Sequence, residues 1–205
     1  MKMLLLQQKK VRGFTLIESV VVTALFAIMS LVVGESIASF YRLNGYTVAQ
    51  AYQVSNAREG MNQLVQDLRE MTFADNGTFP LAVMGDNIIG FYSDIDRDSS
   101  VEYIEYELSS TTLEKRIYNA TGTPLTYGSI PDVAVAVSEY VQNEIQSIPT
   151  FVYYDGVGQL ATATSTVTDI RYIQASIIVN IDPIRDPGEF LLRSSAALRN
   201  LKNTQ

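Results

Sequence analysis

The sequence predicts an α+β fold, in which a long N-terminal α-helix packs on an antiparallel β-sheet domain. No proline occurs before Pro80, so nothing forces a helix to end within the first seventy-odd positions. After residues 75–77 (Asp-Asn-Gly) the helical spacing of apolar residues is replaced by short β-branched and aromatic runs with turn residues between them. A chain of 205 residues has room for one ordinary domain and one long extra element.

The apolar run at residues 14–33 is long enough to cross a membrane as a helix. Its 20 residues contain a single charge, Glu18, and would extend about 30 Å. The basic residues Lys9, Lys10 and Arg12 precede it, which favours a cytoplasmic N-terminus by the positive-inside rule. The sequence therefore predicts that the rest of the chain lies on the outer side of the membrane.

Three kinds of processing are compatible with this run. The chain can remain uncut as a signal anchor, or it can be cleaved after Ala38 as an ordinary secretory signal. An apolar run of this length argues against the second, because signal-peptide cores usually span about 7 to 15 residues. The third is cleavage between Gly13 and Phe14, which leaves the apolar run on the mature protein.

Only the third alternative gives Glu18 a purpose. A carboxylate within the bilayer costs about 2.5–3.5 kcal/mol and is usually paired. In a chain that begins at Phe14, Glu18 would lie about 6 Å along the helix from a new amine. The amine of a neighbouring subunit could then neutralise it when helices pack side by side. The competing interpretation is a shallow glutamate that reaches the lipid headgroups.

The segment from Gly13 to Glu18 (Gly-Phe-Thr-Leu-Ile-Glu) follows a short basic leader and opens an apolar helix. It closely resembles the prepilin-peptidase site of bacterial type IV pilins and type II secretion pseudopilins. The resemblance implies that residues 1–13 are removed by prepilin peptidase and that Phe14 is N-methylated. It also implies that Glu18 acts in assembly with other pilin or pseudopilin subunits, on an assembly platform in the bacterial inner membrane.

Composition removes several classes of function. Cysteine and histidine are both absent, which excludes thiol chemistry, Ser-His-Asp catalysis and histidine metal sites. The net charge is −7, and removal of the four basic residues in segment 1–13 would lower it to −11. An acidic domain of this kind argues against nucleic-acid binding, which depends on Lys and Arg contacts to phosphate. We therefore expect a protein that is not an enzyme.

The helix is predicted to extend over residues 14–72, with residues 14–33 in the membrane or filament core. Its second half carries one apolar stripe at helical spacing, made of Val54, Ala57, Met61, Leu64, Leu68 and Met71. The residues between them, Asp67 included, are predicted to form a polar face. Gly34 and the pair at residues 44–45 (Asn-Gly) are the expected points of bending or local melting.

Residues 73–205 are predicted to form a globular domain rich in antiparallel strands. The expected strands are at 87–92, 101–108, 113–118, 150–156 and 169–182. The segment 133–146 fits either a strand or a short helix. The polar segment 158–169 is expected to be a loop.

An acidic segment at residues 94–105 has the spacing of a twelve-residue calcium loop. Asp94, Asp96 and Asp98 would be the first ligands, followed by the carbonyl of Ser100 and by Glu102 and Glu105. Position 99 is serine where such loops need glycine, and strands rather than helices flank the segment. The alternative is an Asp-rich hairpin turn with local hydrogen bonds, in which Glu102 and Glu105 lie on opposite faces of a strand.

Two functional hypotheses follow. The first is a structural subunit of a pilus or pseudopilus, whose size and Asp-rich hairpin favour a minor subunit; no cofactor is required apart from a possible calcium ion. The second is an uncleaved, membrane-anchored ectodomain that binds calcium or a surface ligand, with Tyr103 and Tyr106 as exposed recognition residues. The alternative for these two tyrosines is that they are packing residues, as tyrosines in strands more often are. Secretion, adhesion, motility and DNA uptake systems share the same N-terminal design, so the sequence leaves the system open.

Overall fold

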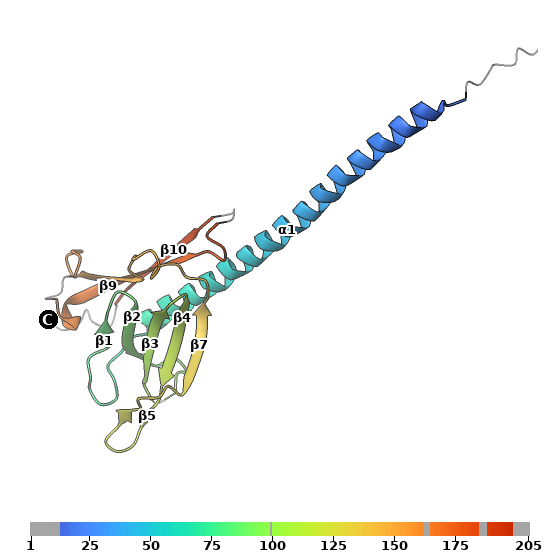
Figure 1. Cartoon of the computed structure of the whole chain (residues 1–205). Helices are drawn as coiled ribbons and strands as arrows, with labels where there is room; N and C mark the ends of the chain where they lie inside the picture. Colours follow the sequence, from blue (N-terminus) through green and yellow to red (C-terminus); the bar gives the residue numbers. More distant parts are fainter. Residues whose placement is uncertain (1–12, 99, 162–164, 185–187, 199–205) are drawn as a thin grey trace, which may run out of the picture. The chain divides into compact units, whose positions relative to one another are not determined.

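The computed structural model describes residues 13–98, 100–161, 165–184 and 188–198. The chain divides into two compact units, one ending at Tyr46 and the other beginning at Thr47. Among the described residues, the helix α1 (Leu16–Arg69) contributes to both units, and every strand belongs to the second. The fold is therefore α+β, with one long N-terminal helix followed by an antiparallel β domain, as the sequence predicts (Figure 1).

In the first unit α1 is largely apolar, and nearly all of its side chains are exposed, with Tyr46 at the end of the unit as a buried exception. An 18-residue window has a mean hydropathy of 2.4 with none of it buried, so by length and composition the helix can cross a membrane. The hydroxyls of Ser30 and Ser36 donate to carbonyls one turn earlier, each at 2.8 Å. These bonds satisfy polar groups that would otherwise be costly in an apolar environment. The helix continues through Gly34 and Gly45, so the expected local melting is absent.

In the second unit α1 packs against the β domain through the predicted stripe. All six stripe residues are buried, and Ala57 and Leu64 are completely inaccessible. The helix ends at Arg69, earlier than the predicted residue 72, because the chain then pairs with a strand. Met71 forms a β-bridge with Ser93, and the amide of Thr72 donates to the carbonyl of Tyr92 at 2.9 Å.

The larger sheet has five antiparallel strands in the order β1-β2-β3-β4-β7 (Figure 1). Their bounds are β1 (Leu81–Met84), β2 (Ile88–Ser93), β3 (Glu102–Ser109), β4 (Thr112–Tyr118) and β7 (Val133–Ser138). Along β3 buried and half-buried residues alternate strictly, as expected for a strand with one face on the core. The buried side chains of Tyr106 and Phe91 stack on this face, with ring centroids 6.2 Å apart.

A second sheet has three antiparallel strands in the order β10-β9-β8. They are β8 (Phe151–Asp155), β9 (Ile170–Val179) and β10 (Phe190–Ala197), and the short helix η1 (Val167–Asp169) precedes β9. A small hairpin is made of β5 (Ala120–Thr121) and β6 (Thr126–Tyr127). Side chains of α1 and of both sheets form one hydrophobic core, which includes Leu64, Phe91, Phe151 and Ile173.

The five predicted strands are confirmed within a few residues as β2, β3, β4, β8 and β9. The ambiguous segment 133–146 begins as a strand, β7, and then forms turns rather than a helix. The segment 158–169 is irregular where it is described, apart from a bridge at Leu160 and the helix η1. The strands β1, β5, β6 and β10 are not predicted from the sequence, because three of them are four residues long or shorter and β10 lacks a clean alternation.

Candidate processing, assembly and metal sites

The predicted cleavage site lies in non-helical backbone just before α1 begins at Leu16. Phe14 is 75% exposed, and no described residue lies within 4 Å of the position that a side chain at Gly13 would occupy. Exposed peptide bonds outside helices and strands are the preferred sites of proteolytic cleavage. The geometry is therefore compatible with cleavage between Gly13 and Phe14, which stays a prediction. The leader residues 1–12 lie outside the described residues.

Glu18 lies in the first turn of α1 and is exposed. Its backbone amide donates to the hydroxyl of Thr15 at 3.3 Å, so Thr15 caps the helix with Glu18 three residues later. A negative charge in the first turn interacts favourably with the positive end of the helix dipole. Among the described residues no cation lies within ion-pair distance of Glu18, and the carboxylate is available to an external partner.

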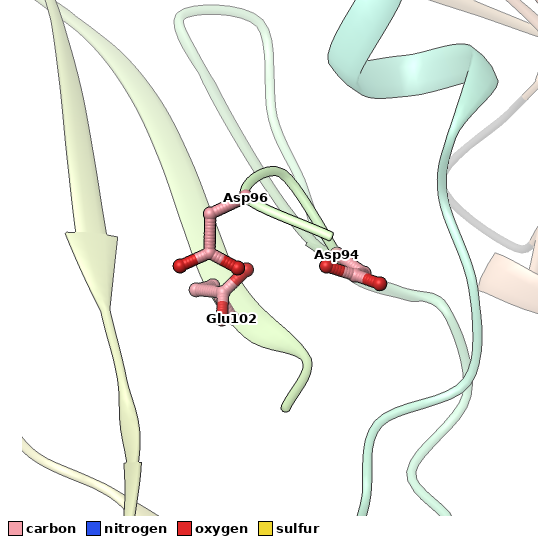
Figure 2. Close-up of side chains that lie close together, drawn as sticks. All are labelled: Asp94, Asp96 and Glu102. Atoms are coloured by element: carbon pink, nitrogen blue, oxygen red, sulfur yellow. The ribbon is translucent and has the colours of Figure 1, made fainter. Parts of the chain in front are cut away.

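The acidic segment brings three carboxylates together, and they are not the three aspartates expected first. Asp94, Asp96 and Glu102 each offer an oxygen, and these atoms lie within 4.8 Å of one another. Glu102 is at the start of β3, and both aspartates are on the loop that precedes it (Figure 2). One oxygen of Asp94, Oδ1, is buried and accepts no hydrogen bond, which is uncommon for a buried polar atom.

Glu102 is the buried member of this group, with 2% of its surface exposed. Its carboxylate accepts hydrogen bonds from the amide of Ile95 at 3.1 Å and from the hydroxyl of Ser100 at 3.3 Å. Burial raises the pKa of Glu102, and the nearby negative charge of Asp96 adds to the increase. The folded protein therefore accommodates the ionised form of Glu102 at a cost.

Asp98 and Glu105 lie outside the three-carboxylate group. Asp98 accepts hydrogen bonds from the amide and the hydroxyl of Ser100, at 2.5 and 2.8 Å, which lower its pKa. Glu105 lies on the opposite face of β3 from Glu102 and pairs with Arg116. The loop thus combines the two interpretations of the sequence, since it contains Asx-type turns and also a compact carboxylate group that uses only one glutamate.

The tyrosines proposed for recognition have different environments. Tyr106 is completely buried, so the expectation that it is exposed is wrong. Its hydroxyl donates to Oδ2 of Asp67 at 2.7 Å, and burial together with that carboxylate raises its pKa far above the usual range. Tyr103 is half-buried, in a cluster with Tyr92, Tyr118 and Tyr127.

Asp67 itself was predicted to lie on the polar face of the helix, and this is also wrong. It is 5% exposed and forms an ion pair with Lys115 of β4 at 2.6 Å. Helical spacing could not reveal this pair, because it depends on a lysine 48 residues further along the chain. The only signal in the sequence is that Asp67 directly precedes the stripe residue Leu68.

Residues 8–34 match the family model of the prokaryotic N-terminal methylation motif. No curated protein matches the chain. The matched segment contains the predicted cleavage site, Glu18 and the apolar first part of α1. Together with the α+β fold, in which a long N-terminal helix precedes an antiparallel β domain, the motif supports a member of the type IV pilin and pseudopilin family.

Proposed function

We propose that the chain is a structural subunit of a type IV pilus or of a type II secretion pseudopilus. It is made as a precursor, cleaved by prepilin peptidase between Gly13 and Phe14, and N-methylated on Phe14. It is then assembled with other subunits through the apolar part of α1, in which Glu18 pairs with the amine of a neighbouring subunit. Its size and its acidic hairpin favour a minor subunit.

The observation that carries this proposal is the methylation motif at residues 8–34, which includes the first part of an uncovered apolar helix. Side chains such as Phe26, Leu31 and Phe40 are between 65% and 75% exposed. An apolar surface of this extent is unstable in water and requires lipid or the helices of other subunits. Before assembly the subunit is held in the bacterial inner membrane with its N-terminus in the cytoplasm and its β domain outside.

Intact mass and N-terminal sequencing of the protein from its native membrane test this proposal. A mature chain that starts at N-methylated Phe14 is the expected result. A chain that starts at Met1 would instead be an uncleaved anchor, and one that starts at Ser39 would be an ordinary secreted protein; either start contradicts the proposal. A Gly13→Val variant serves as a processing control, and we expect it to accumulate as the full-length precursor.

A second candidate function, calcium binding, is favoured by the three-carboxylate group and by the unpaired oxygen of Asp94. Calcium binds oxygen ligands at about 2.3–2.6 Å, so oxygens on one ion can be up to about 5 Å apart. The oxygens of Asp94, Asp96 and Glu102 meet that limit, as they lie within 4.8 Å of one another. We propose that these residues hold a calcium ion that would supply the missing partner of Asp94 and neutralise buried Glu102.

Thermal unfolding of the full chain in detergent, with and without calcium, tests this second proposal. Calcium at about 100 times its dissociation constant would add about 2.7 kcal/mol and raise the melting temperature by several degrees. We expect Asp94→Asn to abolish the shift. Asp98→Asn is the matched control, because Asp98 lies in the same loop but outside the group, and it should keep the shift. A wild-type melting temperature that does not respond to calcium would refute the site.

A further inference from the structure

The strand β7 forms an edge of the five-stranded sheet and pairs only with β4 among the described strands. Its sequence from Val133 to Ser138 is Val-Ala-Val-Ala-Val-Ser, without charge or proline, and its first four residues are exposed. Natural proteins usually protect edge strands with charges, proline, bulges or a covering segment, because the free backbone groups pair readily with other chains. An exposed apolar edge of this kind therefore indicates an interaction surface.

The other edges in the described part of the chain are protected in these ways. The strand β1 is four residues long and has an irregular register between Leu81 and Val83. The outer side of β8 is partly paired, since the amide of Ala161 donates to the carbonyl of Tyr153 at 2.8 Å. The strand β10 carries Arg193 at its centre. The strand β7 also has an irregular register, opposite Leu113 and Glu114 of β4, but this lies at its C-terminal end. Its residues 133–136 pair regularly with β4 and combine apolar side chains with a side that no described strand covers.

A groove of about 510 Å³ lies between β7 and α1. The side chains of Val133 and Val135 share a face with those of Ile117 and Lys115, their partners on β4, and this is the face on which α1 packs. The helix leaves the outer part of this face uncovered, so that Val133 and Val135 remain 44% and 55% exposed. The groove therefore offers an apolar floor next to a free strand edge.

The charges on this groove are acidic. Glu59 of α1 and Glu139, which follows β7, both line the groove and are exposed, and no cation among the described residues pairs with either. The positive charge of Lys115 is already neutralised by Asp67. The groove therefore carries two uncompensated negative charges, which would attract a basic group.

We propose that β7 and this groove, called here the β7 groove, form a docking site for an extended segment of a partner protein. The segment adds a strand to the β7 edge, places alternate apolar side chains over Val133 and Val135, and presents a basic residue to Glu59 and Glu139. Main-chain hydrogen bonds supply affinity in such strand addition, and pockets for alternate side chains supply specificity. A second copy of this acidic chain fits less well, because it would bring further negative charge to the groove.

The test uses a fluorescent synthetic peptide in which valine alternates with threonine and one valine is replaced by lysine, so that the lysine shares the valine face that meets the groove. It is titrated with the full chain in detergent and followed by fluorescence anisotropy. We expect binding that is lost when alternate backbone nitrogens of the peptide are methylated, because N-methyl groups cannot donate to a strand edge. Replacement of the peptide's lysine by glutamate should weaken binding about tenfold, through repulsion from the groove.

Variants of the protein complete the test. Val135→Arg should weaken binding of the lysine peptide at least about tenfold, because it charges the apolar floor. Val157→Arg is the matched control, since Val157 is 81% exposed in a turn away from the groove, and it should bind normally. Glu59→Gln with Glu139→Gln should weaken the lysine peptide and leave the glutamate peptide unchanged or tighter.

Several results would overturn the docking site. These are equal binding of the N-methylated peptide, equal behaviour of the two arginine variants, or no binding of any peptide up to its solubility limit. Dimers of the full chain that disappear in Val135→Arg would assign the edge to self-association and overturn the partner proposed here. The processing of Val135→Arg should be normal, with N-methylated Phe14, so failure at β7 is distinguishable from failure of the proposed filament function.

Discussion

The Nζ atom of Lys115 on β4 lies 2.6 Å from Oδ2 of Asp67 on α1, and the two side chains are only 6% and 7% exposed. The same oxygen accepts the hydroxyl proton of Tyr106 on β3 at 2.7 Å. Three elements therefore meet at one carboxylate. Because a buried charge is tolerated only when it is paired and hydrogen-bonded, this contact specifies how the second half of α1 lies on the sheet.

Removal of one member of this pair should be strongly destabilising. We expect Asp67→Ala to lower the free energy of unfolding by about 3–5 kcal/mol, because it leaves the ammonium of Lys115 buried without a partner. Tyr106→Phe removes a single hydroxyl that donates to a buried carboxylate and should cost less, about 1.5–3 kcal/mol. Urea unfolding of the full chain in detergent, followed by tyrosine fluorescence, measures both. The double variant Asp67→Leu with Lys115→Met should recover most of the loss; if it is as unstable as Asp67→Ala, the unpaired charge is not the cause.

Two glycines of α1 should respond in opposite ways to alanine. A Cβ atom at Gly60 would overlap Cγ1 of Val137 and lie 2.8 Å from its carbonyl oxygen, whereas nothing lies within 4 Å of the same position at Gly45. We expect Gly60→Ala to cost about 1–3 kcal/mol through overpacking against β7. Gly45→Ala should instead gain up to about 1 kcal/mol from helix propensity. Thermal unfolding measures both, and a stabilised Gly60→Ala variant would contradict the close approach of α1 to β7.

Glu18 should matter for assembly and not for processing. We expect Glu18→Ala to be cleaved and methylated as usual but to enter filaments at least about tenfold less, because the apolar helix then lacks the carboxylate that is proposed to pair with a neighbour's amine. Glu35→Ala is the matched control on the same helix, since Glu35 already pairs with Arg42 at 3.0 Å. Immunoblots of sheared filaments and of membranes separate the two effects. Normal filaments from Glu18→Ala would count against the pairing.

Stability should depend on pH through Glu102. Burial raises the pKa of Glu102, so the folded state favours the protonated carboxyl group. The stabilisation that results is fully present below the pKa of the same group in the unfolded chain, about 4.3. It is lost as the pH rises through the higher folded pKa. We therefore expect Glu102→Gln, without calcium, to match the wild type near pH 4 and to be more stable near pH 7. Melting temperatures across this range test the sign, and a variant less stable at pH 7 would contradict it.

Much of the fold follows from local patterns. The 3.6-residue period predicts the buried face of α1, including Leu64 and Leu68, because a helix places such residues on one side whatever it packs against. The β-branched and aromatic run at residues 101–108 predicts β3, and the two-residue period of a strand predicts the opposite orientation of Glu102 and Glu105. Very short strands such as β1 carry too few residues for any period to be recognised.

The candidate sites also differ in how far they depend on residues that are close together in the chain. Gly13, Phe14 and Glu18 are neighbours in the chain, so their spacing is fixed by the sequence and the motif can be recognised there. The carboxylate group is only partly local: the sequence points to the segment from Asp94 onward, but folding of the loop selects Glu102 and leaves Asp98 out.

What the sequence alone determined is the N-terminal motif, the apolar helix and the alternation of the main strands, since each depends on residues close in the chain. The tertiary structure decided the burial of Asp67 against Lys115, the choice of carboxylates around Asp94, and the exposure of β7 beside a groove. Each of these depends on which distant segments come together. Such contacts form only when the whole core packs, because the cost of burying a charge or leaving an edge free is set by the surrounding chain.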